Sequence, residues 1–191
     1  MKLVQTAFDD VLILEPVIHQ DDRGYFFESW NQKAFEDAGL HYTWVQDNQS
    51  KSIYGTVRGI HYQKLPHTQT KFVHVLQGTI LDVIVDLRAG SSTYGQHLVI
   101  ELSAESHRQI LIPHGFGHGY SVLSDTAVIA YKCDNYYAPD AEGIINAYDH
   151  NLAIDWGIGL HKAIRSDKDI KAQSFEQYSQ SPDFVYRKGQ C

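Results

Sequence analysis

Four polar clusters lie within strand-like stretches of this 191-residue chain, where apolar side chains would cost less free energy. A buried polar group needs a hydrogen-bond partner or a solvated cavity, so such clusters mark candidate sites. The clusters are 22–28 (DRGYFFE), 46–50 (QDNQS), 57–63 (VRGIHYQ) followed by Lys71, and 112–119 (IPHGFGHG) followed by Tyr131. A histidine, a tyrosine and a lysine in one cavity could transfer protons and stabilise negative charge.

The third and fourth clusters supply the groups that could act as base and acid. Strand alternation predicts that Arg58 and His61 point to opposite faces, and that Tyr131 shares a face with Ala127 and Ile129. A lone histidine in a strand is more often a hydrogen-bonded structural residue, and a lone tyrosine is more often a core residue. The functional interpretation therefore depends on these residues occurring together.

The first two clusters also have simple structural interpretations. At 22–28 a turn enters a strand, and alternation places Phe26 and Glu28 on one face. A turn ion pair with a core phenylalanine would explain the same residues equally well. The amide-rich stretch 46–50 is, by itself, most typical of a loop.

A metal site has to be considered because the chain is rich in histidine. His61, His74, His118 and Glu101 could form the three-histidine, one-carboxylate set used by β-barrel dioxygenases. Those enzymes carry a His-x-His pair on one strand, whereas this sequence reads His-Tyr-Gln from residue 61. We therefore expect no metal, and keep a metal-dependent oxygenase as an alternative.

Composition excludes several classes of protein. The net charge is −7 without a block of Lys or Arg, which argues against nucleic-acid binding but leaves room for an anionic small ligand held by a few cations. The longest apolar run is 127–131, too short to span a membrane, and the N-terminus has no apolar signal core. Cys133 and Cys191 form neither a disulfide framework nor a zinc motif, so we expect a protein of the reducing cytoplasm.

The elements that must position these residues are mainly strands. Short apolar runs recur roughly every 8–12 residues between turn-forming residues, as in an all-β sandwich or barrel. Eight or more antiparallel strands in two sheets indicate a jelly-roll, cupin-like fold with a few short helices. We expect one domain over 1–191, in which residues from about 156 on form a C-terminal extension packed on the barrel.

Local patterns predict several individual elements. In 82–87 the odd-numbered residues should face one side of a strand and the even-numbered residues the other. Residues 77–79 should form a tight hairpin turn. Residues 31–38, closed by Gly39, are typical of a short helix with a glycine terminator. A second helix is expected within 166–178, with a Ser or Asp cap at its start.

Taken together and in this order, the motifs resemble those of the nucleotide-sugar 3,5-epimerases that make dTDP-4-dehydro-L-rhamnose. The resemblance extends from Lys2 to about Asp169. It rests on DDRGYFFES, VQDNQSKS, RGIHYQ, QTKFV with GTILDVIVDLR, RQILIPHGFGHG, AYKCDNYY and SDKD. Two features depart from it: His74 stands where relatives often carry Arg, and the tail 171–191 matches no family pattern.

The resemblance implies a metal-free jelly-roll homodimer with a nucleotide sugar in the barrel, and the N-terminal strands are expected to cross to the partner. It implies that His61 is the base, Asp169 its orienting carboxylate, Tyr131 the acid and Lys71 the cation that stabilises an enolate. The substrate-binding residues that it implies are Arg23, Phe26, Glu28, Gln46, Asn48, Arg58, His118, Glu142 and Lys168.

The chemistry of a 4-keto sugar fits these residue types. The C–H bonds at C3 and C5 are acidified by the ketone, so inversion needs a base on one face, a proton donor on the other and a cation at the enolate. This chemistry requires no redox cofactor or metal, so we expect no cofactor. Sibling reactions on the same scaffold remain alternatives: epimerisation at C3 or C5 alone, or 3,4-ketoisomerisation. A non-catalytic nucleotide-sugar binder is a further alternative.

Overall fold

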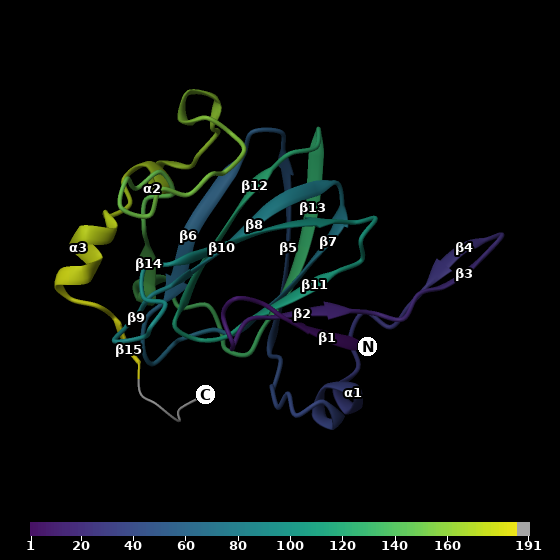
Figure 1. Cartoon of the computed structure of the whole chain (residues 1–191). Helices are drawn as coiled ribbons and strands as arrows, with labels where there is room; N and C mark the ends of the chain where they lie inside the picture. The colour runs from purple at the N-terminus through teal and green to yellow at the C-terminus, as the bar shows by residue number, and fades with distance from the viewer. Residues whose placement is uncertain (187–191) are drawn as a thin grey trace.

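Two antiparallel sheets form the body of the protein (Figure 1). The computed structural model describes residues 1–186. The first sheet, in spatial order, contains β1 (Lys2–Gln5), β2 (Leu12–Glu15), β11 (Gln109–Ile112), β7 (Lys71–Gln77), β13 (Thr126–Cys133) and β5 (Gln46–Ile53). The second contains β10 (His97–Ser103), β8 (Thr79–Asp86), β12 (Phe116–Val122), β6 (Val57–Gln63) and β14 (Glu142–Ile144). This is the jelly roll that the sequence predicts.

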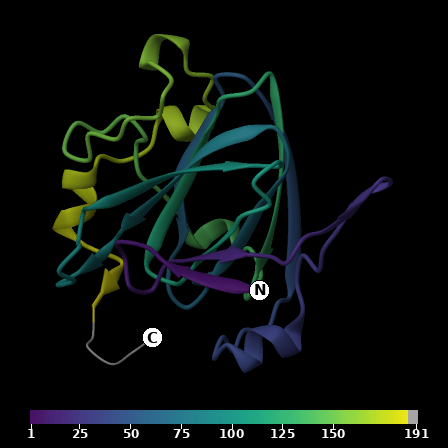
Figure 2. The same ribbon diagram turned by 45° about the vertical axis from the view of Figure 1, so that its right-hand side comes forward.

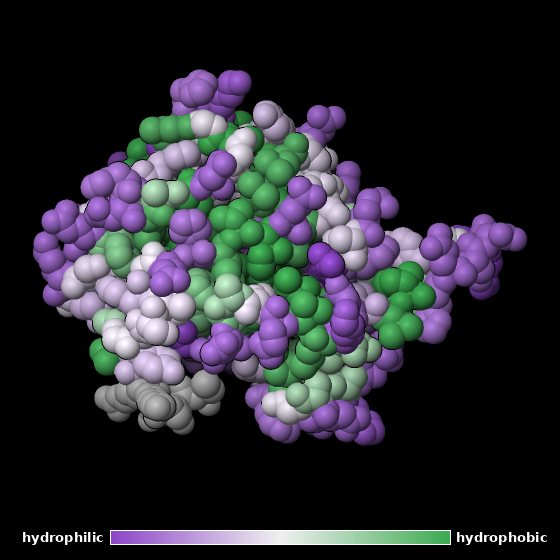
Figure 3. All heavy atoms as spheres, in the orientation of Figure 1, coloured by the Kyte–Doolittle hydropathy of each residue, from purple (hydrophilic) through white to green (hydrophobic). Residues whose placement is uncertain are grey.

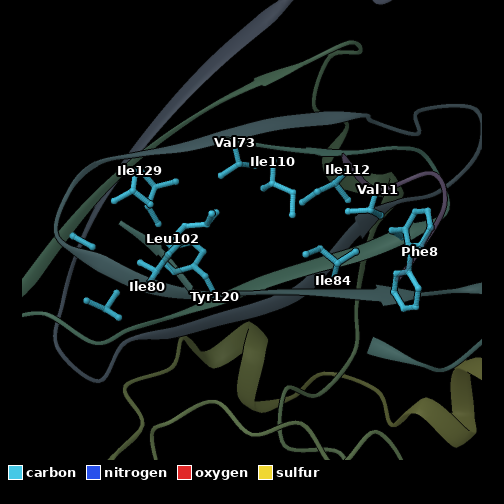
Figure 4. Packing of buried hydrophobic residues seen from close by; sticks show 14 residues of the cluster. Phe8, Val11, Val73, Ile80, Ile84, Leu102, Ile110, Ile112, Tyr120 and Ile129 are labelled. Atoms are coloured by element: carbon cyan, nitrogen blue, oxygen red, sulfur yellow. The ribbon is translucent and has the colours of Figure 1, made fainter. Parts of the chain in front are cut away.

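The main core lies between the two sheets (Figure 4). Val73, Ile110 and Ile129 of the first sheet meet Ile80 and Ile84 of the second, and all five side chains are buried. Truncating one such side chain to Ala typically costs about 2–5 kcal/mol, so this contact holds the sheets at a fixed spacing. The site residues project from the same inner faces.

A second core covers the outer face of the five-stranded sheet. Val83, Val85 and Leu87 belong to it, whereas Ile84 faces the main core, so the predicted alternation in 82–87 is confirmed. The C-terminal residues supply the other side of this contact, with Tyr178 buried and its hydroxyl donating to the carbonyl of Leu87 at 2.7 Å. The extension is thereby fixed against the barrel wall.

Short helices and small strands complete the described chain. The predicted first helix is confirmed as α1 (Gln32–Asp37), where the Asn31 side chain accepts from the amide of Ala34 and Gly39 has a φ of 80°. The expected second helix is divided into α2 (Asp167–Ile170) and α3 (Phe175–Gln180), because Ser174 begins a new capping box. Two 3₁₀ turns, Pro139–Ala141 and Leu160–Lys162, and a parallel pair, β9 (Arg88–Ala89) with β15 (Phe184–Val185), complete the list.

A register shift in β6 changes which side chains face inward. His118 of β12 pairs with His61, but Tyr120 pairs with Arg58, so Gly59 and Ile60 together oppose Gly119. A two-against-one arrangement of this kind is a β-bulge, and it reverses the alternation across the extra residue. The prediction that Arg58 and His61 face opposite sides is therefore wrong, because both line the same cavity.

Glycine is required within this bulge. Gly59 has a φ of 124°, and a Cβ atom there would lie 2.5 Å from the Cα of Gly119. The predicted turn at 77–79 is also confirmed, with Gly78 at a φ of 80° between β7 and β8. In both places the backbone conformation excludes an ordinary side chain.

A hairpin arm projects away from the barrel. Strands β3 (His19–Asp21) and β4 (Gly24–Phe26) form a two-stranded sheet of their own, which extends from the body in two views 45° apart (Figures 1 and 2). Helix α3 packs on the opposite side of the barrel, and the tip of the arm is hydrophilic (Figure 3). None of the helices in residues 1–186 has both the length and the apolar character needed to cross a bilayer.

Candidate active site

A cavity of about 370 Å³ opens between the two sheets and collects most of the candidate residues. Strands β5, β6, β7, β12, β13 and β14 each contribute a side chain to its wall. The candidates that line it are His61, Lys71, Tyr131, Gln46, Asn48, Arg58, His118 and Glu142. The stretch 46–50 is strand β5 rather than a loop, since alternate side chains turn toward this cavity.

His61 is held by a carboxylate from the C-terminal extension. Its Nε2 lies 2.8 Å from Oδ1 of Asp169, which is only 3% exposed. The other ring nitrogen, Nδ1, lies 3.5 Å from Oε1 of Glu142, a residue of the cavity wall. A hydrogen bond from Nε2–H to Asp169 leaves Nδ1 with its lone pair, which is the form a general base needs.

Asp169 is itself fixed by several donors. Ser166, the N-cap of α2, donates its hydroxyl to Oδ2 at 2.6 Å and its backbone amide at 3.3 Å, while the amide of Gly59 donates to Oδ1 at 3.3 Å. Burial alone would raise the pKa of Asp169, but hydrogen bonds from His61 and Ser166 outweigh it and hold the pKa below its usual value. The carboxylate therefore stays ionised beside His61.

Glu142 and Lys168 form a second contact beside His61. The Lys168 ammonium donates to Oε2 of Glu142 at 2.8 Å, which connects α2 to the cavity wall. Burial raises the pKa of Glu142, but the hydrogen bond from Lys168 and the nearby His61 lower it more strongly. Glu142 is accordingly an anion that a ligand could engage in place of Lys168.

Tyr131 and Lys71 project into the cavity from β13 and β7 of the other sheet. Burial, with smaller effects of Cys133 and Tyr120, raises the pKa of Tyr131 to about 12, so its hydroxyl is a proton donor at neutral pH. Burial lowers the pKa of Lys71, an effect opposed by the charges of Cys133, Asp82 and Glu142. Tyr131 shares its face with Ala127 and Ile129, as alternation predicts.

A second histidine–aspartate pair lies on the wall formed by β12 and β8. Nε2 of His118 is 2.7 Å from Oδ1 of Asp82, and Asp82 is completely buried. Its second oxygen, Oδ2, has no hydrogen-bond partner among residues 1–186. His118 lines the cavity, so its remaining nitrogen, Nδ1, is the one that a ligand could reach.

The three candidates of the arm lie apart from this cavity. Arg23 forms an ion pair with Asp21 at 2.6 Å, Glu28 accepts from Asn31 at 3.0 Å, and Phe26 is 67% exposed. The structural interpretation of a core phenylalanine is therefore wrong for Phe26. Within the single chain, the arm contributes nothing to the wall around His61.

The candidate metal ligands do not form one group. His61 and His118 line the cavity, whereas His74 lines two hollows on the outer side of the first sheet and Glu101 is exposed on β10. Among residues 1–186, no three His, Cys, Asp or Glu side chains are arranged to hold a metal ion. Cys133 is a buried free thiol, and Cys191 lies outside the described residues.

Sequence reasoning missed several residues of the site. Tyr120, Tyr137, Gln63 and Ser50 line the cavity, and Asp82 and Ser166 support it from behind. Tyr120 could have been found, since it lies two residues beyond His118 on one strand. An aspartate on the inward face of an apolar strand was a second available signal.

Comparisons with known proteins agree over nearly the whole chain. A family model described as dTDP-4-dehydrorhamnose 3,5-epimerase matches residues 5–177. The dTDP-4-dehydrorhamnose 3,5-epimerase of Shigella flexneri is 46% identical over 176 residues, which are 92% of this chain and 96% of the relative.

Solved structures give the same result. The crystal structure of a dTDP-6-deoxy-D-glucose-3,5-epimerase from Legionella pneumophila, in complex with dTDP-4-keto-L-rhamnose, has a TM-score of 0.92 and 42% identity, covering 97% of this chain and 98% of the other. The crystal structure of a 3'-monoepimerase from Streptomyces bikiniensis, in complex with dTDP-quinovose, has a TM-score of 0.86 and 32% identity, and the match covers 92% of this chain and 89% of the other.

Proposed function

The chain belongs to the dTDP-4-dehydrorhamnose 3,5-epimerase family, and we propose that three side chains of its cavity act in the epimerisation as a base, an acid and a stabilising cation. The enzyme is an isomerase that inverts C3 and C5 of dTDP-4-dehydro-6-deoxy-D-glucose to give dTDP-4-dehydro-L-rhamnose. The observation that carries the proposal is the 2.8 Å contact between His61 and Asp169, in the same cavity as Tyr131 and Lys71.

His61 is proposed as the base. Nδ1 takes the proton from the carbon next to the ketone; the C–H electron pair forms a C=C bond, and the π pair of the carbonyl moves onto oxygen to give an enolate. Asp169 stabilises the imidazolium that results and fixes the ring in the correct tautomer. Loss of that proton to solvent restores His61 for the next carbon.

Tyr131 is proposed as the acid on the opposite face of the sugar. Its hydroxyl gives its proton to the same carbon while the enolate electrons return to that carbon, which restores the ketone with inverted configuration. The phenolate then regains a proton from solvent. The raised pKa of Tyr131 supports this assignment, because the hydroxyl is protonated before each turnover.

Lys71 is proposed to stabilise the negative charge on the enolate oxygen. An ammonium in a buried wall is favourable there, since charge interactions are stronger where water is excluded. The other cavity residues are proposed to bind the dTDP-sugar. These are Gln46, Asn48, Arg58, His118 and Glu142, with Lys168 at the edge.

Arg23, Phe26 and Glu28 are proposed to complete the site of a second copy in a homodimer. The arm that carries them extends away from its own barrel, and Tyr25 and Phe26 on it are 59% and 67% exposed. The ring of Tyr25 packs against Phe27 and His107, whereas Phe26 is the more exposed of the two and is proposed to meet a partner surface. The strand β1 lies at the edge of its sheet, and β3 and β4 form the arm, so these N-terminal strands are proposed to make the crossing to the partner.

Mixing two inactive variants tests the arm. An Arg23→Ala/Glu28→Ala protein keeps His61 but has a defective arm, whereas His61→Asn has an intact arm and no base. After unfolding and refolding together, mixed dimers should regain about one quarter of wild-type activity, because half of the dimers are mixed and each holds one complete site. No recovery in a demonstrably mixed dimer, or a monomer in solution, contradicts the proposal.

We also propose a cytoplasmic location. Cys133 is a free thiol in the core, as in proteins of reducing compartments.

The test of the reaction is solvent exchange. Incubation with dTDP-4-keto-6-deoxyglucose in deuterated water should place deuterium at both C3 and C5, as followed by NMR, while the product with inverted configuration accumulates. Deuterium at C3 alone would instead indicate a 3-epimerase, the activity named for the Streptomyces bikiniensis relative. Absence of exchange at both carbons would reject the base assignment.

A further inference from the structure

The buried pair formed by His118 and Asp82 has no role in the proposed base and acid steps. Asp82 lies on β8 between Ile80 and Ile84, with its side chain on the inner face of the barrel and no exposed surface. Figure 4 shows Ile80 and Ile84 pointing into the packed interior between the sheets. A carboxylate here replaces an apolar side chain that would pack in the same row.

The carboxylate of Asp82 receives few hydrogen bonds from the described residues. Oδ1 meets Nε2 of His118 at 2.7 Å, whereas Oδ2 is buried without a hydrogen-bond partner among residues 1–186. Burying an ionised group with one partner is costly unless a nearby positive charge compensates. The Lys71 ammonium supplies such a charge through its electrostatic interaction with Asp82, while His118 makes the one hydrogen bond.

A second proton shared between Asp82 and His118 would place a hydrogen on Nδ1, the ring nitrogen that faces the cavity. If His118 is an imidazolium, Nε2–H donates to the Asp82 carboxylate and Nδ1–H is free to donate into the cavity. If the proton moves to Asp82, its hydroxyl donates to Nε2 and Nδ1 still carries a hydrogen. In both of these forms Nδ1 is a donor in the wall that also contains Lys71. A neutral ring that donates from Nε2 to an ionised Asp82 would present a lone pair instead, but that form leaves a charged carboxylate with Oδ2 buried and without a hydrogen-bond partner among residues 1–186.

We propose that Asp82 is a positioning residue for the epimerisation, holding His118 and the Lys71 ammonium as paired hydrogen-bond donors to the enolate oxygen. The assignment rests on the proposed function, since it needs an enolate in the cavity. His118 keeps its protons through the cycle and only donates hydrogen bonds, so the proton balance of the base and acid steps is unchanged. Charge stabilisation that grows as the enolate forms raises kcat rather than binding alone.

The negative charge of Asp82 also favours the protonated form of Lys71. The titratable groups around Lys71 are Asp82 on β8, Glu142 on β14, Tyr131 and Cys133 on β13, His61 on β6 and His118 on β12. Burial lowers the pKa of Lys71, and Asp82 acts against that effect. Removing the charge of Asp82 should therefore make Lys71 lose its proton at a lower pH.

The substitution Asp82→Asn tests this, because it keeps the shape and removes the charge. We expect kcat to fall by about tenfold or more while KM changes little, and the alkaline limb of the kcat profile to move to lower pH. The matched control is Asp86→Asn, the same change four residues along β8 at another fully buried carboxylate. Asp86 bonds Arg88, Ser91 and Thr93, so the control should lower stability but leave kcat per folded enzyme and the alkaline limb in place.

A measurement on the wild type makes the test independent of folding. Nitrogen-15 NMR of the ring of His118, assigned by its loss in His118→Gln, should show a proton on Nδ1 at pH 7. An unprotonated Nδ1, or an Asp82→Asn enzyme with wild-type kcat and an unmoved alkaline limb, overturns the inference. Wild-type enzyme that exchanges no deuterium would instead reject the proposed function.

Discussion

Asp169 and Asp82 each contact a cavity histidine, at 2.8 and 2.7 Å, but the two carboxylates differ in the other hydrogen bonds that they receive. Asp169 receives three further hydrogen bonds, two from Ser166 and one from Gly59. Oδ2 of Asp82 receives none from the described residues. The first pair joins the barrel to the C-terminal extension, whereas the second lies within one sheet.

The hydrogen-bond donors around each carboxylate determine whether the histidine beside it can act as a base or as a hydrogen-bond donor. A carboxylate that is already stabilised by the backbone and a serine does not need the histidine to be charged, so His61 can stay neutral and accept a proton. A carboxylate with a single donor depends on the proton that His118 supplies. One kind of residue pair can thus provide a base on one wall and a hydrogen-bond donor on another.

The largest expected effect comes from His61→Asn. Asparagine has no group that can accept the carbon-bound proton, so exchange at C3 and C5 should fall by about 10²–10⁴-fold or more, with the fold intact. Deuterium incorporation and circular dichroism would check the two parts. Exchange within tenfold of wild type would show that the base lies elsewhere and that the comparison of the two pairs is misplaced.

Asp169→Asn should have the next largest effect, through His61. The amide can hold the ring but cannot stabilise the imidazolium, and it can select the wrong tautomer. We expect kcat to fall by roughly 10²-fold or more while dTDP binding, measured by calorimetry, stays near that of the wild type. Normal turnover by this variant would mean that the two aspartates are equivalent supports.

Tyr131→Phe should separate exchange from inversion. Phenylalanine keeps the ring volume and removes the hydroxyl, so packing changes little. His61 can still remove a proton and return a deuteron to the same face, so exchange should persist at a measurable fraction of wild type while the inverted sugar accumulates much more slowly. The same change at Tyr136, which is 65% exposed, is the control and should leave both rates unaltered. Wild-type inversion by Tyr131→Phe would contradict the assignment.

Ser166→Ala should produce the smallest effect, and it directly tests the hydrogen bonds that distinguish Asp169 from Asp82. It removes the hydroxyl donor to Asp169 and the N-cap of α2, so kcat should fall only a few-fold and stability by about 1 kcal/mol. The folded-state pKa of Asp169 is lowered, so its contribution to stability is present above its unfolded pKa and lost as pH falls through the folded one. The loss in melting temperature should therefore be larger at pH 7 than at pH 3, and an equal loss at both would contradict the role of Ser166.

The fold could be predicted from the sequence because most strands follow a simple alternation. The pattern in 82–87 separated Val83 from Ile84 correctly, since β8 is covered on both faces by core. Alternation failed at β6, where an extra residue places Arg58 and His61 on one side. No single-strand pattern reports a register shift, because it depends on the neighbouring strand.

The site was less predictable wherever it depends on distant contacts. The resemblance of the motifs predicts that Asp169 orients His61, although the two residues are 108 positions apart in the sequence. Local sequence patterns cannot predict a contact over that separation. Asp82 was read only as one member of an alternating strand, since its role depends on His118 and Lys71. For Arg23, the motif match indicates a role in binding but does not say which copy of the chain it would serve.

The bulge in β6 has a consequence for insertions and deletions. Deleting one residue between Arg58 and His61 would restore a regular ladder against β12, a change that favours the sheet itself. Arg58 and His61 would then be two positions apart and would still share the face that lines the cavity, but deleting Gly59 would remove the backbone amide that donates to Asp169. The extra residue of the bulge therefore serves the carboxylate behind His61 and not the direction of the two side chains. Alignments of related sequences should count the residues between this arginine and this histidine before the same support of the base is assumed.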